Sequence, residues 1–307
     1  MDAHSSGPSD FEPDVRRSLR RLSLVIVGFC LLAVITVQPH AVRAAVDEFE
    51  TMMGRKSDAA LAVPAKVPRR AQGTLDAMTP QAQAELLLDE SIHNEEGALE
   101  DLYARAGGWR EYVQMTPKLS QELDAALNAN DLQVRAAALD IYLAVYDVEK
   151  QSASVSMLDQ RISAEPEARP WALFSLGALG NRGIEPIGVF RKLSDYTHDP
   201  NADTRAWTME SLAILGTNEA LDPLLDALRN DPSPLVRDRA ACGLAQSGMF
   251  TREQRRSAVP RLLDIAEDPA LDATSRGYVF HALQDITGGN AGSDAKAWRR
   301  WWQQHGS

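Results

Sequence analysis

Histidine, cysteine and serine are the residue types that could give this chain catalytic chemistry. None of the histidines falls in the His-Glu-x-x-His pattern that binds zinc on a helix. The sequence also has neither the Gly-x-Ser-x-Gly turn of serine hydrolases nor a glycine-rich phosphate loop. The two cysteines, Cys30 and Cys242, lie in segments of such different character that a disulfide or a metal pair is not expected. These residues predict a protein that is not an enzyme and uses no cofactor and no metal.

Arginines supply the regular pattern that the catalytic residue types lack. They are separated by 34, 36, 32 and 39 residues, and they are Arg135, Arg169, Arg205, Arg237 and Arg276. A leucine follows seven residues after each of the last four, and a glycine follows eleven residues after the middle three. Tyr142 and Tyr146 occupy these two places after the first arginine. A period of this length is typical of stacked helical hairpins, which present long binding surfaces.

The clearest repeat runs over residues 218–248. Leucines at helical spacing over 221–228 predict a first helix, and residues 230–234, which contain two prolines, end it. Val236, Ala240 and Leu244 then predict a second helix. Gly248 is placed to end that helix, because glycine tolerates the left-handed conformation of a helix terminus.

The segments from Asp231-Pro-Ser-Pro to Leu244 and from Asp199-Pro-Asn-Ala to Leu212 resemble HEAT repeats. The likeness is to the phycobilisome-lyase type found in bacterial HEAT repeat proteins, and it covers about residues 116–289. It implies an all-α solenoid of about five hairpins. Members of this family act as scaffolds, adaptors and occasionally enzymes. It also implies a structural ladder of turn aspartates and helix arginines, whose matching residues here are Asp199, Arg205, Asp231 and Arg237.

A candidate partner-binding groove follows from aligning the second helices by their arginines. Positions two and five residues after each arginine point away from the apolar side of the helix. We predict that a protein partner binds the residues at these positions, which are Trp171, Phe174, Trp207, Glu210, Arg239, Tyr278 and His281. Two alternatives stay open: the large side chains could simply pack neighbouring helices together, or Glu210 and His281 could form a proton-transfer pair. The groove requires that Trp171 and Trp207 are accessible to solvent.

Both ends of the repeat array are expected to carry caps, since an open end would expose an apolar face. Thr79-Pro80 and Thr116-Pro117 are helix starts in the first cap, and Trp298, Trp301 and Trp302 lie on a last helix that seals the array or offers an aromatic surface. The predicted segments are a basic terminus (1–21), a signal or membrane segment (22–44), a linker (45–73), a helical cap (74–130), repeats (131–289) and a capping helix (290–307).

Residues 22–37 form a long apolar run that follows four arginines. This asymmetry keeps the amino terminus in the cytoplasm and sends the rest of the chain across the membrane. The run is short for a bilayer span, and Val42-Arg43-Ala44 suits signal-peptidase cleavage, so cleavage and retention as a transmembrane anchor both stay open. Either fate predicts a repeat domain on the periplasmic side of a bacterial inner membrane, with membrane association if the run is retained.

The net charge of the chain limits the class of partner that it is expected to bind. The chain carries 32 basic and 43 acidic residues, a net charge of −11, which disfavours nucleic acid as the main ligand. We therefore predict a noncatalytic protein-binding scaffold or adaptor in the cell envelope. The alternatives are an enzyme or accessory subunit with a small-molecule site, and a mainly structural assembly protein. A deep closed pocket with converging polar groups would favour the first alternative over an open groove.

Overall fold

The computed structural model describes residues 73–306, so the expectations for the apolar run and the linker lie outside the described residues. Within this range the chain is all-helical, as predicted, and no helix is long and apolar enough to cross a bilayer. The helices are α3 (Pro80–Ile92), α4 (Ala98–Ala106), α5 (Pro117–Leu127), α6 (Leu132–Val145), α7 (Ser152–Ala164), α8 (Arg169–Asn181), α9 (Pro186–Asp195), α10 (Ala202–Leu215), α11 (Leu221–Asn230), α12 (Pro234–Ala245), α13 (Arg252–Ala266), α14 (Ala273–Thr287) and α15 (Ala295–His305).

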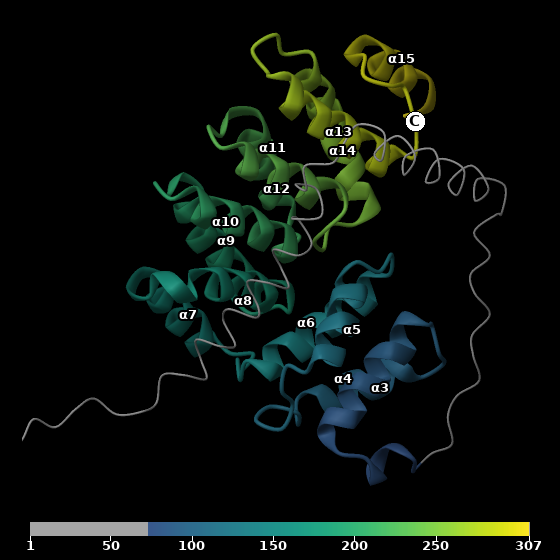
Figure 1. The fold of residues 1–307 in the computed structure, drawn as a ribbon, viewed down its shortest axis with the longest axis vertical. Coiled ribbons are helices and arrows are strands. Elements are labelled where there is room, and N and C mark those ends of the chain that lie inside the picture. The colour runs from purple at the N-terminus through teal and green to yellow at the C-terminus, as the bar shows by residue number, and fades with distance from the viewer. Residues whose placement is uncertain (1–72, 307) are drawn as a thin grey trace, which may run out of the picture. The chain divides into compact units, whose positions relative to one another are not determined.

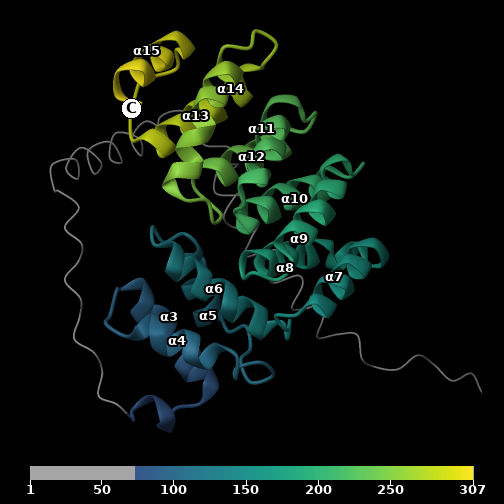
Figure 2. The same ribbon diagram turned by 180° about the vertical axis from the view of Figure 1, so that it is seen from behind.

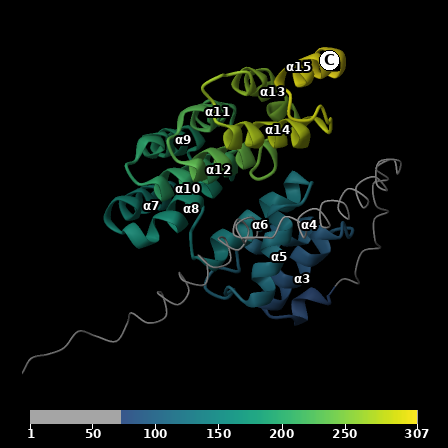
Figure 3. The same cartoon turned by 45° about the horizontal axis from the view of Figure 1, so that its top comes forward.

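Helical hairpins follow one another from α7 to α14, consistent with an α-solenoid (Figure 1). The second helix of each hairpin packs on the second helix of the next, which makes a row of α8, α10, α12 and α14 (Figure 3). Two glycines permit this close packing. A Cβ on Gly177 would lie 2.4 Å from the Ser211 carbonyl oxygen, and one on Gly243 would lie 2.9 Å from the Ala213 Cβ. We call these four helices the second-helix row.

Helices α3 to α6 form a separate arrangement, the N-terminal block, seen in blue and teal in Figure 2. The predicted starts of α3 and α5 are confirmed: Thr79 and Thr116 cap them, and a proline opens each helix. The block has a core of its own that includes Trp109, which is 2% exposed and donates from Nε1 to the Gln83 side chain. Helix α6, which carries the first repeat arginine, packs mainly on α5 and α4, and to a smaller and equal extent on α3 and α8.

The position of Gly248 differs slightly from the prediction. Helix α12 ends at Ala245, and Gly248 lies in the following loop with a φ of +79°. Its neighbour Met249 donates its backbone N–H to the Ala213 carbonyl at 2.8 Å, and a Cβ on Gly248 would lie 2.4 Å from that same oxygen. The glycine is thus required by the approach of the loop to α10 as well as by its left-handed conformation.

Candidate interaction surface

Two residues of the predicted groove are buried. Trp171 and Phe174 on α8 are 8% and 6% exposed, so the expectation of accessible rings is wrong at these two positions. The cover comes from α6: the Tyr142 ring lies 4.6 Å from the Phe174 ring, and the Tyr146 ring lies 6.0 Å from the Trp171 ring. Packing against the N-terminal block therefore accounts for these aromatic side chains.

The same tyrosines explain why α6 does not join the second-helix row. Tyr142 and Tyr146 stand where later repeats have a leucine and a glycine. Their rings contact each other at 4.8 Å and fill the space between α6 and α8. Bulky rings at a helix contact keep the two backbones apart, whereas the glycine of α8 permits close approach to α10.

The other predicted groove residues remain at least partly accessible on α10, α12 and α14. We call them the α10–α14 strip: Trp207, Glu210, Arg239, Tyr278 and His281. Arg239 joins two repeats, since its Nη1 lies 3.2 Å from Glu210 Oε2 and its guanidinium lies 6.0 Å from the Trp207 ring centre. Both members of this ion pair are largely buried, with side-chain exposures of 13% and 16%. Arg239 thus links Trp207 and Glu210 of α10 to α12.

Asp238 is a charged residue of this region that the positional alignment missed. Burial raises the pKa of its carboxyl, while the nearby charges of Arg239 and His281 act in the opposite direction. It also acts on Tyr278, whose pKa is raised first by burial and then by this negative charge. Asp238 lies one residue after the repeat arginine, outside the two positions that the helical projection selects. Its role depends on side chains of the next repeat, which a projection of one helix does not include.

Glu210 and His281, considered above as a proton-transfer pair, form no hydrogen bond or ion pair with each other in the described part of the chain. The carboxylate of Glu210 is engaged by Arg239 instead. No group of three or more potential metal-ligating side chains occurs between residues 73 and 306. Cys242 is a half-buried residue on α12. The geometry of the strip favours recognition by aromatic and charged side chains.

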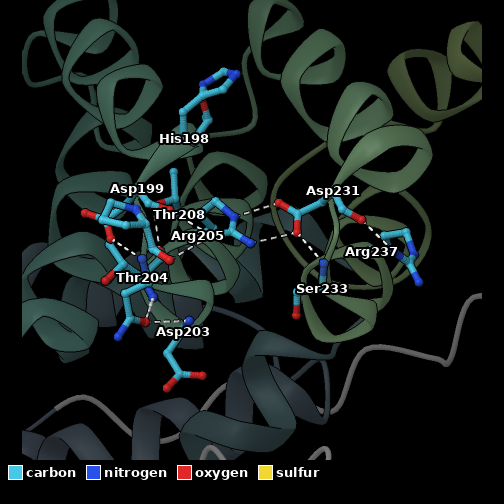
Figure 4. A network of polar contacts seen from close by, with 12 residues as sticks. His198, Asp199, Asp203, Thr204, Arg205, Thr208, Asp231, Ser233 and Arg237 are labelled. Atoms are coloured by element: carbon cyan, nitrogen blue, oxygen red, sulfur yellow. Dashed lines mark hydrogen bonds and ion pairs between the residues drawn. The ribbon is translucent and has the colours of Figure 1, made fainter.

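The predicted ladder residues come together at the turns between repeats (Figure 4). Arg205 donates from Nε and Nη2 to both carboxylate oxygens of Asp231, at 2.7 and 3.0 Å, and from Nη1 to the Asp199 carbonyl. Arg237 repeats this plan, with bonds to the Asp231 carbonyl at 2.6 Å and an ion pair with Asp272 at 3.2 Å. Each arginine thus joins its own turn to the next turn, which is a structural role.

Asp199 takes a different place from Asp231. Its carboxylate accepts the backbone N–H of Asn201 at 2.8 Å and so shapes its own turn. The arginine of the preceding repeat, Arg169, donates from Nε to the Ile162 carbonyl. Among the described residues, Arg169 and Asp199 form no hydrogen bond or ion pair with each other. The side-chain ladder therefore begins at Arg205, and Asp199 contributes its main-chain carbonyl.

The last helix closes the row at its carboxyl end. Trp298 is 2% exposed and donates from Nε1 to the Gly292 carbonyl at 2.7 Å. Trp301 packs over Gly289 and stacks on His305, with ring centres 4.7 Å apart. Trp302 lies under the guanidinium of Arg256 at 5.0 Å. This arrangement fits a capping helix, in which the rings of Trp301 and Trp302 remain partly exposed.

Comparison with known proteins agrees with this geometry. No curated protein matches the chain. The family model for HEAT repeats matches residues 155–245, which run from α7 to the end of α12. This part of the chain contains the two clearest hairpins and the Arg205–Asp231 contact. The match supports HEAT-like repeats over residues 155–245.

Proposed function

We propose that this protein is a noncatalytic scaffold or adaptor that binds a protein partner on the α10–α14 strip. HEAT repeats generally mediate protein–protein interaction. The observation that carries the proposal is the half-exposed Trp207, held between repeats by the Glu210–Arg239 pair. Tryptophan, tyrosine and arginine are the residue types that contribute most to protein interfaces.

The strip is suited to binding because much of it is already ordered. Arg239 is fixed by Glu210 and lies against the Trp207 ring, so a partner would not have to immobilise these side chains. Ordering a long side chain on binding costs about 0.5–1.5 kcal/mol. Tyr278 and His281 extend the surface onto α14, which packs on α12. A partner crossing the strip would therefore contact three successive repeats.

We place this activity in the bacterial cell envelope, on the periplasmic side of the inner membrane. The support is the sequence: an apolar run at residues 22–37 follows four arginines, an arrangement that directs the following domain across the membrane. Fusing a reporter enzyme active only in the periplasm to Ser307 tests the placement, and activity confined to cytoplasmic reporters would contradict it.

Site-specific photo-crosslinking in intact cells tests the binding surface. A benzophenone amino acid replaces Trp207 or Tyr278. In a control it replaces Ile187, which is 69% exposed on α9, the first helix of its hairpin. We expect one dominant protein adduct from the strip positions and none from position 187. Equal adducts from all three positions, or adducts from position 187 alone, would contradict the α10–α14 strip as the binding surface.

A further inference from the structure

A cleft of about 700 Å³ lies where the loop between α5 and α6 meets the ends of α12 and α14 and the start of α13. Its wall includes three arginines and one carboxylate: Arg135, Arg252, Arg255 and Asp285. The exposed side chains of Arg252 and Asp285 place its mouth at the surface. The cleft therefore has an excess of positive charge in a chain whose net charge is −11.

Two of these arginines are buried without a carboxylate partner among the described residues. Arg135 and Arg255 are 8% and 9% exposed, and within the described residues the acceptors of their hydrogen bonds are all peptide carbonyls. Both contact the loop after α12: Arg135 Nη1 donates to the Gln246 and Gly248 carbonyls at 2.9 and 2.6 Å. Carbonyl dipoles orient a guanidinium but carry no net charge, unlike the carboxylate that faces Arg205. The charge of Asp285 compensates Arg255 only in part.

The buried charges repel each other across the cleft. Burial, and secondly the positive charge of Arg135, lower the pKa of Arg255 to about 10. Arg135 donates only from Nε and Nη1 within the described part of the chain, so Nη2 has no acceptor there, although the residue is nine-tenths buried and lines the cleft. An anion in the cleft would meet this donor and would relieve the repulsion between the two guanidinium groups.

The cleft is continuous with the α10–α14 strip. On α14 the residues Tyr278, His281 and Asp285 follow one another at spacings of three and four, so they lie on one face of the helix. On α12, Arg239 and Gln246 lie seven residues apart on one face in the same way, and the Gln246 side chain donates to Asp285 at 2.7 Å. A peptide segment that follows either helix from the strip toward its carboxyl end would reach the arginines.

We propose that this cleft binds acidic side chains of the partner segment that crosses the strip. The inference rests on the proposed function, and it adds the chemistry of the partner: a stretch rich in Asp or Glu next to the part that contacts Trp207. Carboxylates match the planar donor geometry of arginine, and an open cleft lined by helix ends and loops suits an extended peptide.

Fluorescence anisotropy with a fluorescein-labelled tetraglutamate peptide tests this proposal on the full-length chain in mild detergent at low salt. The informative variant is Arg252→Glu, since this side chain is exposed and its replacement leaves the buried arginines in place. We expect the variant to bind the peptide about tenfold more weakly, because it reverses one charge of the cleft. Asp285→Asn removes the opposing carboxylate, and we expect it to bind about threefold more tightly.

Arg191→Glu is the matched control, because Arg191 is exposed on α9 and the substitution changes the net charge equally. It should bind the peptide like the wild type. Equal weakening by both reversals, or no measurable binding, would overturn the proposal. Binding of inorganic pyrophosphate that depends on Arg252, without peptide binding, would overturn it in favour of a phosphate ligand. A Trp207 crosslink that persists in either case would leave the adaptor function standing.

Discussion

The N-terminal block and the second-helix row share one local contact of a repeat arginine, but the arginine has different long-range partners in the two regions. In both, a repeat arginine donates to a carbonyl of the turn before its own helix: Arg135 to Ala129 and Arg205 to Asp199. In the row, the rest of the guanidinium reaches the carboxylate of the next turn, Asp231. In the block, it reaches the carbonyls of a loop 111 and 113 residues further along the chain. A local contact shared by the two regions thus fixes the turn, while the rest of the guanidinium has different long-range partners in the two regions.

The two regions also differ in how closely their helices approach. The row depends on glycines at backbone contacts, and the block depends on large side chains such as Trp109 in a core of its own. We therefore expect the two regions to respond to different substitutions. Hydrogen exchange can show whether they also open as separate cooperative units.

Removing Trp109 should have the largest effect. Trp109→Ala leaves a large cavity and removes the indole N–H that donates to Gln83 Oε1. We therefore expect a loss of about 3–5 kcal/mol in the free energy of unfolding. Urea denaturation measures the loss, and hydrogen exchange should rise in α3–α6 more than in α10–α14. Tyr112→Ala, at a ring that is 67% exposed, should have little effect. A uniform rise across all helices would show one cooperative unit.

A methyl group at the closest helix contact should cost less. Gly177→Ala would place its Cβ 2.4 Å from the Ser211 carbonyl oxygen, so α8 and α10 would have to separate. We expect a loss of about 2–3 kcal/mol, with faster hydrogen exchange in these two helices. Gly277→Ala on α14 meets no heavy atom within 4 Å and should stabilise the protein by about 0.5–1 kcal/mol. Equal effects of the two substitutions would show that the row does not depend on close backbone contact.

Breaking the ladder should cost about 2 kcal/mol. Arg205→Gln leaves the Asp231 carboxylate, which is 7% exposed, without its bidentate partner. The matched control is Arg261→Gln, whose partner Asp222 is 77% exposed, and it should change the stability by no more than about 0.5 kcal/mol. Thermal unfolding of both variants measures the difference. A similar small change in both would show that the ladder contributes no more than an ordinary surface ion pair.

The regular part of the fold could be predicted from the sequence because its contacts repeat with the sequence period. Arg205, Asp231 and Arg237 are bonded to turns that lie within one repeat of each other. The cover over Trp171 could not be predicted in this way, since it comes from an irregular packing of α6. The only sequence signal was the pair of tyrosines that replace a leucine and a glycine in the first unit.

The arginine cleft shows the same limit more strongly. Arg255 belongs to no periodic position, and Arg135 matches the repeat pattern but binds a loop more than 100 residues away. A helical projection reports which side of one helix a residue occupies, and it contains no information on which distant segment covers that side. The strip was found because it follows the period, and the cleft was missed because it lies where the N-terminal block meets the ends of α12 and α14.

The smallest expected effect concerns pH, because carboxyl groups of the two regions differ in the direction in which their pKa values are shifted. In the row, hydrogen bonds from Ser275 and the charge of Arg237 lower the pKa of Asp272. In the block, burial raises the pKa of Asp124 on α5 to about 6, and its carboxylate accepts no hydrogen bond from the other described residues. Because the folded pKa of Asp124 lies above its unfolded value near 3.8, ionisation in the folded state is unfavourable. This penalty is absent below about pH 4 and fully present above about pH 6.

Asp124→Asn should therefore raise the melting temperature at pH 7 and leave it nearly unchanged at pH 4, so the difference from the wild type grows as the pH rises through this window. Melting curves between these two pH values measure it. Asp203→Asn, at an exposed position of α10, controls for the general effect of removing one negative charge. A difference for Asp124→Asn that is constant with pH, or equal to that of the control, would show that this carboxyl ionises in the block as freely as it does in the unfolded chain. The N-terminal block would then be more open to water around α5 than its packing indicates.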